Sequence, residues 1–167
     1  MKIVKTTDKT FQQQALDLAL RVFMEFEAPD YPYEGTEEFK RSLQNPAYID
    51  NLCYYIAIEQ EEVIGMLATR NKGRHIALLF VDAQWQRKGI GRKLIEVALE
   101  DCKGSTMTVN SAPFAHGFYK EVGFEDTDVE QLTNGIRYIP MNKINSLKNN
   151  PLFNVSSTNC ICALRVN

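Results

Sequence analysis

Apolar residues recur along the chain at two spacings, one typical of helices and one typical of strands. Between residues 11 and 26 they recur at every third or fourth position, which predicts an amphipathic helix opened by Asp8 as its N-cap. A similar stripe over residues 90–102 predicts a second long helix that stops at Gly104. Two shorter helices are predicted, at 36–44 behind Thr36 and at 112–122 behind a Ser111 cap.

Runs of β-branched and aromatic residues predict the strands. These runs are residues 2–6, 53–59, 63–71, 75–83, 105–110, 124–132 and 136–142. The second and third are separated only by "QEE" and predict a hairpin, and Asn134-Gly135 predicts a turn. Leu78 to Val81 are apolar on consecutive positions, which favours a central strand covered on both faces. The order of elements predicts an α/β fold, a single mixed, mainly antiparallel sheet flanked by helices.

Length and composition predict one domain. The chain has 167 residues and 44% hydrophobic composition, enough for one sizeable core. We expect this domain to occupy residues 1–144. Residues 145–167 are rich in Asn and Ser and end in "CICALRV", so we interpret them as an extension of unknown role that could add an edge strand.

Charge and cysteine usage narrow the function classes. The net charge of −2 argues against a nucleic-acid binder, and four irregularly spaced cysteines with two histidines argue against a metal site. No apolar run approaches the length of a membrane span, and the first residues do not resemble a secretory signal. We therefore expect a cytoplasmic protein without nucleic-acid or membrane partners, either a monomer or a homodimer.

The stretch "QRKGIG", residues 86–91, lies where the central strand passes into a helix. It lacks the spacing of a P-loop, and Leu94 stands where a dinucleotide fingerprint requires a third glycine. Two glycines at a helix start allow backbone amides to approach one ligand, with the positive end of the helix behind them. The stretch therefore predicts a site for a pyrophosphate.

The chain resembles the GNAT superfamily of acyl-CoA-dependent N-acetyltransferases in two motifs. Gln86 to Gly91 match the signature Gln/Arg-x-x-Gly-x-Gly/Ala, and "NSAPFAHGFYKEVGF", residues 110–124, resembles the second family signature. The resemblance covers about residues 1–143. It implies transfer of an acetyl group from acetyl-CoA to a primary amine by direct attack in a ternary complex, with acetyl-CoA as co-substrate and no metal. A non-catalytic acyl-CoA-binding or sensing module is the alternative.

The resemblance also implies which residues bind acetyl-CoA. The strand backbone would pair with the pantetheine arm, and the turn would hold the pyrophosphate. The implied residues are Leu79, Phe80, Val81, Gln86, Arg87, Lys88, Gly89, Ile90, Gly91, Arg92 and Asn110. Asn110 would bond the pantetheine amides or hold two strands apart.

Catalysis requires an acid for the leaving thiolate and a base for the attacking amine. The second motif implies that Tyr119 is the acid. His75 is the first candidate for the base, because it opens the strand that carries the acyl group and has an unperturbed pKa near 6.5. Glu25 and Glu27, acting through water, are its competitors.

The acceptor site is implied to lie between the first two helices. Phe26, Glu27 and Tyr31 are its expected substrate-binding residues, and the acidic side chains of residues 25–38 favour a cation. A small amine, an aminoglycoside and a protein lysine or N-terminus all remain open as acceptors.

Overall fold

The computed structural model describes residues 1–146, and residues 147–167, all but two residues of the predicted extension, lie outside them. The strands are β1 (Lys2–Thr6), β2 (Cys53–Glu59), β3 (Glu62–Arg70), β4 (His75–Val81), β5 (Thr106–Ser111), β6 (Glu125–Asp126), β7 (Gln131–Thr133) and β8 (Ile136–Ile144). The α-helices are α1 (Lys9–Phe26), α2 (Tyr33–Gln44), α3 (Pro46–Ile49), α4 (Ile90–Asp101) and α5 (His116–Glu121). Short 3-10 turns lie at Ala28–Asp30, Ala83–Trp85 and Pro113–Ala115.

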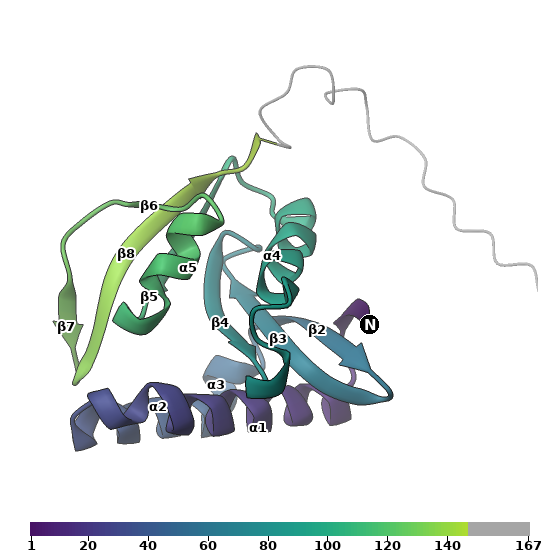
Figure 1. Cartoon of the computed structure of the whole chain (residues 1–167), viewed down its shortest axis with the longest axis horizontal. Coiled ribbons are helices and arrows are strands. Elements are labelled where there is room, and N and C mark those ends of the chain that lie inside the picture. Colours follow the sequence, from purple (N-terminus) through teal and green to yellow (C-terminus); the bar gives the residue numbers. More distant parts are fainter. Residues whose placement is uncertain (147–167) are drawn as a thin grey trace, which may run out of the picture.

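The strands form one sheet in the order β1-β2-β3-β4-β5-β8-β6, with β7 paired to β8 (Figure 1). All neighbours are antiparallel except β4 and β5, which are parallel. This confirms the predicted mixed, mainly antiparallel sheet and places the apolar strand β4 at its centre.

The two central parallel strands separate soon after they meet. β4 and β5 pair only at His75 with Thr108 and at Ile76 with Val109. On its other side, β4 stays paired to β3 up to Val81. The sheet therefore opens from Ala77 onward, and the edge of β4 that faces β5 has no strand partner there among the described residues.

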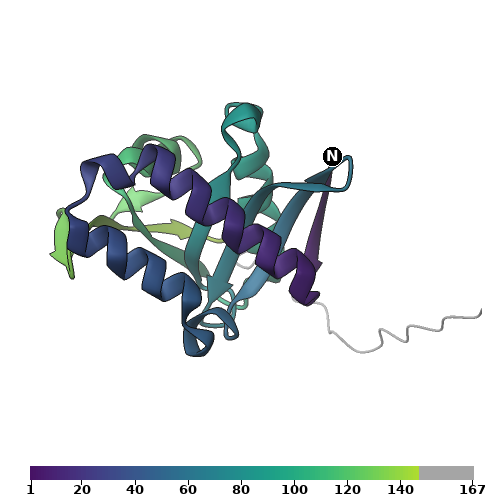
Figure 2. The same ribbon diagram turned by 90° about the horizontal axis from the view of Figure 1, so that it is seen from below.

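Helices cover both faces of the sheet and bury its two cores. α1 and α2 cover one face, which Figure 2 shows from below, whereas α4 and α5 lie on the other face (Figure 1). Neighbouring residues of β2 alternate between the cores, with Ile56 packed in the α1 core and Ala57 in the α4 core. The stripe of α1 is buried as predicted, and Asp8 accepts hydrogen bonds from the backbone amides of Thr10 and Phe11.

The β7–β8 hairpin reaches from one half of the open sheet to the other. Its tip, the predicted turn at Asn134 and Gly135, lies against the first turn of α2 (Figure 1). A Cβ atom added to Gly35 would collide with the Gly135 carbonyl oxygen. Tyr31 also donates a hydrogen bond to the Arg137 carbonyl oxygen at 3.2 Å. The hairpin is therefore in contact with α2 and the segment before it.

Several predicted boundaries are wrong. α2 begins at Tyr33 rather than Thr36, because Pro32 takes the N-cap position and Gly35 packs on the hairpin. Ser111 ends β5 and donates to the Ala112 carbonyl, so it caps no helix, and a 3-10 turn precedes α5. The predicted strand 124–132 is two short strands, both paired to β8, and α4 ends before Gly104.

The last described residues are attached to the core. Asn145 is buried, and its backbone amide donates to the Ser105 carbonyl at 2.8 Å. Its side-chain amide donates to the carbonyl oxygens of Leu99 at 3.0 Å and Gly104 at 3.4 Å. Among residues 1–146, none of the helices combines the length and the apolar character needed to cross a membrane.

Candidate active site

Two cavities meet where the sheet opens. The turn cavity has a volume of about 620 Å³ and lies beside residues 86–92. The α2 cavity has a volume of about 460 Å³ and lies between β4, β5 and the face of α2. Five residues line both cavities: Glu27, Leu79, Phe80, Ala115 and Tyr119. A ligand that fills the turn cavity can therefore meet a second ligand in the α2 cavity at these residues.

The glycine turn is held on the end of β4 by its own glutamine. The Gln86 side chain donates to the Val81 carbonyl oxygen at 3.1 Å. Gly89 is the N-cap of α4 in a left-handed conformation, with φ of +78°. A Cβ atom at Gly89 would meet no protein atom within 4 Å, so the space in front of this backbone is open. These features fit a cradle in which amides face a phosphate group.

The second glycine of the turn has a packing role. A Cβ atom at Gly91 would lie 3.0 Å from the Phe118 ring. The absence of a side chain at Gly91 therefore lets α4 pack closely on α5. Among the charged residues of the turn, Arg87 and Arg92 line the turn cavity, whereas Lys88 lies outside its lining and places its Nζ 4.5 Å from the centre of the Trp85 ring.

The junction of the two cavities holds one carboxyl group and one phenol. Burial raises the pKa of Glu27, at the end of α1, from 4.5 to about 7. Tyr119, on α5, is only 5% exposed, and burial together with the Glu27 charge raises its pKa. Near pH 7, Glu27 can therefore accept a proton, while the Tyr119 hydroxyl stays protonated and can donate one.

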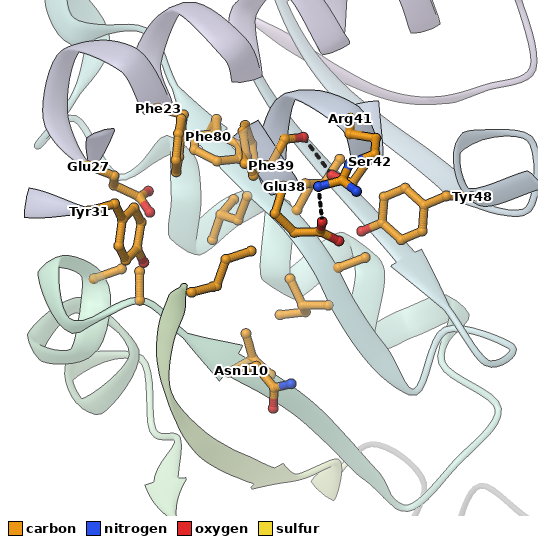
Figure 3. Close-up of a pocket in the computed structure, with 18 of the residues that line it drawn as sticks. Phe23, Glu27, Tyr31, Glu38, Phe39, Arg41, Ser42, Tyr48, Phe80 and Asn110 are labelled. Atoms are coloured by element: carbon orange, nitrogen blue, oxygen red, sulfur yellow. Dashed lines mark hydrogen bonds and ion pairs between the residues drawn. The ribbon is translucent and has the colours of Figure 1, made fainter. Parts of the chain in front are cut away.

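The α2 cavity is walled by aromatic rings. Phe23 stacks on Tyr31 with ring centroids 5.6 Å apart and on Phe39 at 3.9 Å, and Phe39 contacts Phe80 edge to face at 5.8 Å. Figure 3 shows Glu27 and Tyr31 at one end of this wall. Burial and the Glu27 charge raise the pKa of Tyr31 to about 12.

Comparison with known proteins identifies the family. A family model for the acetyltransferase (GNAT) domain matches residues 27–145. The chain belongs to the GNAT acetyltransferase family. A relative from Salmonella typhimurium, named peptidyl-lysine N-acetyltransferase YjaB, is 42% identical over 71 residues, which are 41% of this chain and 47% of the relative. The chain thus spans about half the length of this curated relative.

Solved structures show the same fold at low identity. A GCN5-related N-acetyltransferase from Rhodopseudomonas palustris has a TM-score of 0.73 at 17% identity, covering 86% of this chain and 94% of that one. The PaiA N-acetyltransferase of Thermoplasma acidophilum, solved in complex with coenzyme A, has a TM-score of 0.64 at 16% identity. The match covers 86% of this chain and 99% of that one.

The structure brings together most of the site residues predicted from the GNAT resemblance. Nine of the predicted acetyl-CoA-binding residues line the turn cavity: Leu79, Phe80, Val81, Gln86, Arg87, Gly89, Ile90, Gly91 and Arg92. Asn110 and Tyr31 line the α2 cavity, and Phe26 lines the turn cavity, where it stacks on Phe114 at 5.9 Å. Two residues thus lie in the other cavity than predicted: Asn110, predicted to bind acetyl-CoA, lines the α2 cavity, and Phe26, predicted to bind the acceptor, lines the turn cavity. The individual roles stay predictions.

His75 lies apart from these residues. It lines neither cavity, and its Nδ1 is 2.8 Å from the Thr108 hydroxyl at the closed end of the sheet. Burial, with a contribution from Arg70, lowers its pKa to about 4. The structure therefore does not place His75 beside Tyr119, and a group with this pKa is a weak base for an amine.

Sequence reasoning missed the far end of the α2 cavity. This end is lined by residues from α2, from α3 and from the cap between them: Glu38, Arg41, Ser42, Asn45 and Tyr48. Glu38 was predicted only as one of the acidic residues between 25 and 38, and the pattern gave no signal for the other four. α3, which carries Tyr48, is only four residues long and was not predicted. Within residues 1–146, no group of three or more His, Cys, Asp or Glu side chains is placed to hold a metal ion.

Proposed function

We propose that the chain transfers an acetyl group from acetyl-CoA to a primary amine in a ternary complex. One observation carries this proposal: Glu27 and Tyr119 both line the two cavities where these meet. A base and an acid at the contact between two ligands are what aminolysis of a thioester requires. A module that only bound acyl-CoA would need neither group.

Acetyl-CoA would occupy the turn cavity. Its pyrophosphate would face the backbone amides of residues 87–92, with Arg87 and Arg92 adding positive charge. Its pantetheine arm would lie along the edge of β4 that has no strand partner among the described residues. A protein with the same fold, from Thermoplasma acidophilum, was solved in complex with coenzyme A, which supports coenzyme A as the class of ligand.

Glu27 would act as the base and Tyr119 as the acid. Glu27 removes a proton from the ammonium form of the acceptor, directly or through one water. The neutral amine nitrogen then attacks the thioester carbonyl carbon and forms the new C–N bond. When the C–S bond breaks, the Tyr119 hydroxyl gives its proton to the thiolate. The attacking nitrogen, positively charged once the C–N bond has formed, loses a second proton to water, and Tyr119 regains its proton from water. The raised pKa of Glu27 supports its role, because a base is most effective when its pKa lies near the working pH.

The acceptor amine would enter through the α2 cavity. Aromatic rings that flank a carboxyl group suit an alkyl chain that ends in an ammonium group. The printed name of the Salmonella typhimurium relative, a peptidyl-lysine N-acetyltransferase, makes a lysine side chain one acceptor to test.

A thiol-release assay tests the proposal. Acetyl-CoA would be mixed with alkylamines, an aminoglycoside and a lysine peptide, and mass spectrometry would identify the acetylated product. We expect amine-dependent release that Tyr119→Phe and Glu27→Gln both reduce. Binding of acetyl-CoA without acetylation of any amine would reject the enzyme and favour the non-catalytic module.

A further inference from the structure

The α2 cavity has two polar ends separated by aromatic rings. Figure 3 shows Glu27 and Tyr31 at one end, Arg41 and Tyr48 at the other, and the ring of Phe39 between them. Both ends line the same cavity. A ligand that extends along this cavity is therefore exposed to two different chemical environments.

The far end is rich in hydrogen-bond donors and carries positive charge. Arg41 forms an ion pair with Glu38 at 2.7 Å, and its side chain is 70% exposed, so part of the guanidinium remains open to a ligand. The Tyr48 hydroxyl points toward the guanidinium in Figure 3. Asn45 accepts a hydrogen bond from the Ala47 amide with its oxygen, which leaves its NH₂ group to donate.

A second arginine adds to this charge. Burial raises the pKa of the Tyr48 hydroxyl, and the positive charge of Arg70, at the end of β3, partly offsets this rise. The guanidinium of Arg41 lines this end beside the carboxylate of Glu38, and Arg70 adds positive charge from outside the cavity lining. A ligand group that accepts hydrogen bonds and carries negative charge is favoured there, whereas a second ammonium group is not.

We propose that the far end of the α2 cavity, with Arg41, Asn45 and Tyr48, binds a carboxylate or carbonyl oxygen at the end of the acceptor opposite its amine. The acceptor class is then an unbranched primary amine that ends in a carboxyl-type group, either a free ω-amino acid or a lysine residue with its main-chain carbonyl. This inference rests on the proposed function, because it takes the Glu27 end as the position of the amine.

The length of the aromatic wall can be compared with the length of an acceptor. Tyr31 and Phe39 lie on either side of Phe23 at 5.6 and 3.9 Å, so this wall is no longer than the two distances together. An extended chain advances about 1.2 Å per bond, as three bonds per residue of about 3.5 Å imply. The seven bonds from the amine to the carboxyl oxygen of 6-aminohexanoate, or of a lysine, span roughly 8 Å. Glycine has three bonds from its nitrogen to its carboxyl oxygen and spans roughly 4 Å, about half of that length.

A panel of matched amines tests the inference. Values of kcat/KM would be measured for 6-aminohexanoate, hexylamine, 1,6-diaminohexane, glycine and a lysine capped at both termini. We expect 6-aminohexanoate or the capped lysine to exceed hexylamine by about 10-fold, the effect of a partly exposed charge-assisted hydrogen bond. A higher value for the capped lysine assigns the far end to a peptide carbonyl, and a higher value for the free acid assigns it to a carboxylate.

Variants separate this site from a general effect of charge. Arg41→Gln should lower the ratio of 6-aminohexanoate to hexylamine by about 10-fold, and Tyr48→Phe should lower it in the same direction. Arg21→Gln is the matched control, because Arg21 is also an exposed arginine in an ion pair, with Asp82, and lines neither cavity. It should leave the ratio unchanged.

Failure of this inference and failure of the proposed function give different results. Acetylation of hexylamine and 1,6-diaminohexane at rates equal to or above those of both 6-aminohexanoate and the capped lysine would overturn the far-end site and leave the proposed function in place. Absence of any acetylation would reject the function, and calorimetry with coenzyme A present would then decide the site. Selective binding of 6-aminohexanoate that Arg41→Gln abolishes would support it, and equal binding of hexylamine would overturn it.

Discussion

The Glu27 carboxyl should reduce the stability of the fold at the pH where its proposed catalytic role requires it to be ionised. Burial raises its pKa in the folded protein to about 7 from 4.5, so the folded state holds the proton more tightly than the unfolded state. The stabilising contribution is complete below about pH 4.5 and is lost as the pH rises through 7. Each pKa unit corresponds to about 1.4 kcal/mol, so the loss amounts to about 3 kcal/mol.

Glu27→Gln keeps the shape of the side chain and removes its ionisation. The variant should match the wild type in free energy of unfolding near pH 4 and exceed it by up to about 3 kcal/mol at pH 8. Its turnover should fall by about 10²- to 10⁴-fold, the usual effect of losing an acid–base group. In the wild type, kcat/KM should decline below about pH 7 as Glu27 takes up its proton, and the variant should lack this decline.

Urea unfolding curves and pH–rate profiles from pH 4 to 9 measure both effects. Glu25→Gln is the control, because Glu25 lies on the same helix, is exposed and lines neither cavity. Glu25→Gln should match the wild type both in free energy of unfolding and in the pH dependence of kcat/KM over this range. A stability difference between Glu27→Gln and wild type that is the same at pH 4 and pH 8 would refute the argument from burial. A decline in rate with a midpoint near pH 4 would instead favour His75, whose pKa is lowered to about that value.

Three further changes test other parts of the site. Tyr119→Phe should lower kcat by about 10²- to 10⁴-fold with little change in acetyl-CoA affinity, and unaltered kcat would reject the acid. Gly89→Val strains a residue with φ of +78° and fills open space, so calorimetry should show at least ~10-fold weaker acetyl-CoA binding. Gly117→Ala, also open but without positive φ, should bind normally. Gly35→Ala should lower the free energy of unfolding in urea by about 1–3 kcal/mol through collision with Gly135, and wild-type stability would argue against that contact.

The sequence by itself determined the main elements and their order. The stripe of α1 and the hairpin of β2 and β3 follow from periodicity. Each face of an element lies either in the core or in solvent, so its apolar residues recur with the period of a helix or a strand. The position of "QRKGIG" between β4 and α4 follows in the same way. The family and the fold were therefore predicted correctly from local pattern and two motifs.

Local pattern did not determine boundaries that depend on distant contacts. α2 begins three residues earlier than predicted, where Gly35 packs on Gly135, one hundred residues later in the chain. The division of residues 124–132 into β6 and β7 depends on where each pairs with β8. The consecutive apolar residues of β4 predicted a strand covered on both faces, whereas Leu79 and Val81 are only half-buried and line the cavities.

The chemistry of the site was decided by the tertiary structure. His75 and Glu27 were both candidate bases by residue type, yet only Glu27 lies at the junction, and their pKa values move in opposite directions, to about 4 and about 7. Arg41 and Tyr48 gave no signal at all. A pKa and a cavity depend on the atoms that surround a group, and those atoms come from elements far apart in the sequence. Spacing along a chain specifies which residues share a helix face or a strand, but only the packed fold determines how deeply a carboxyl group is removed from water.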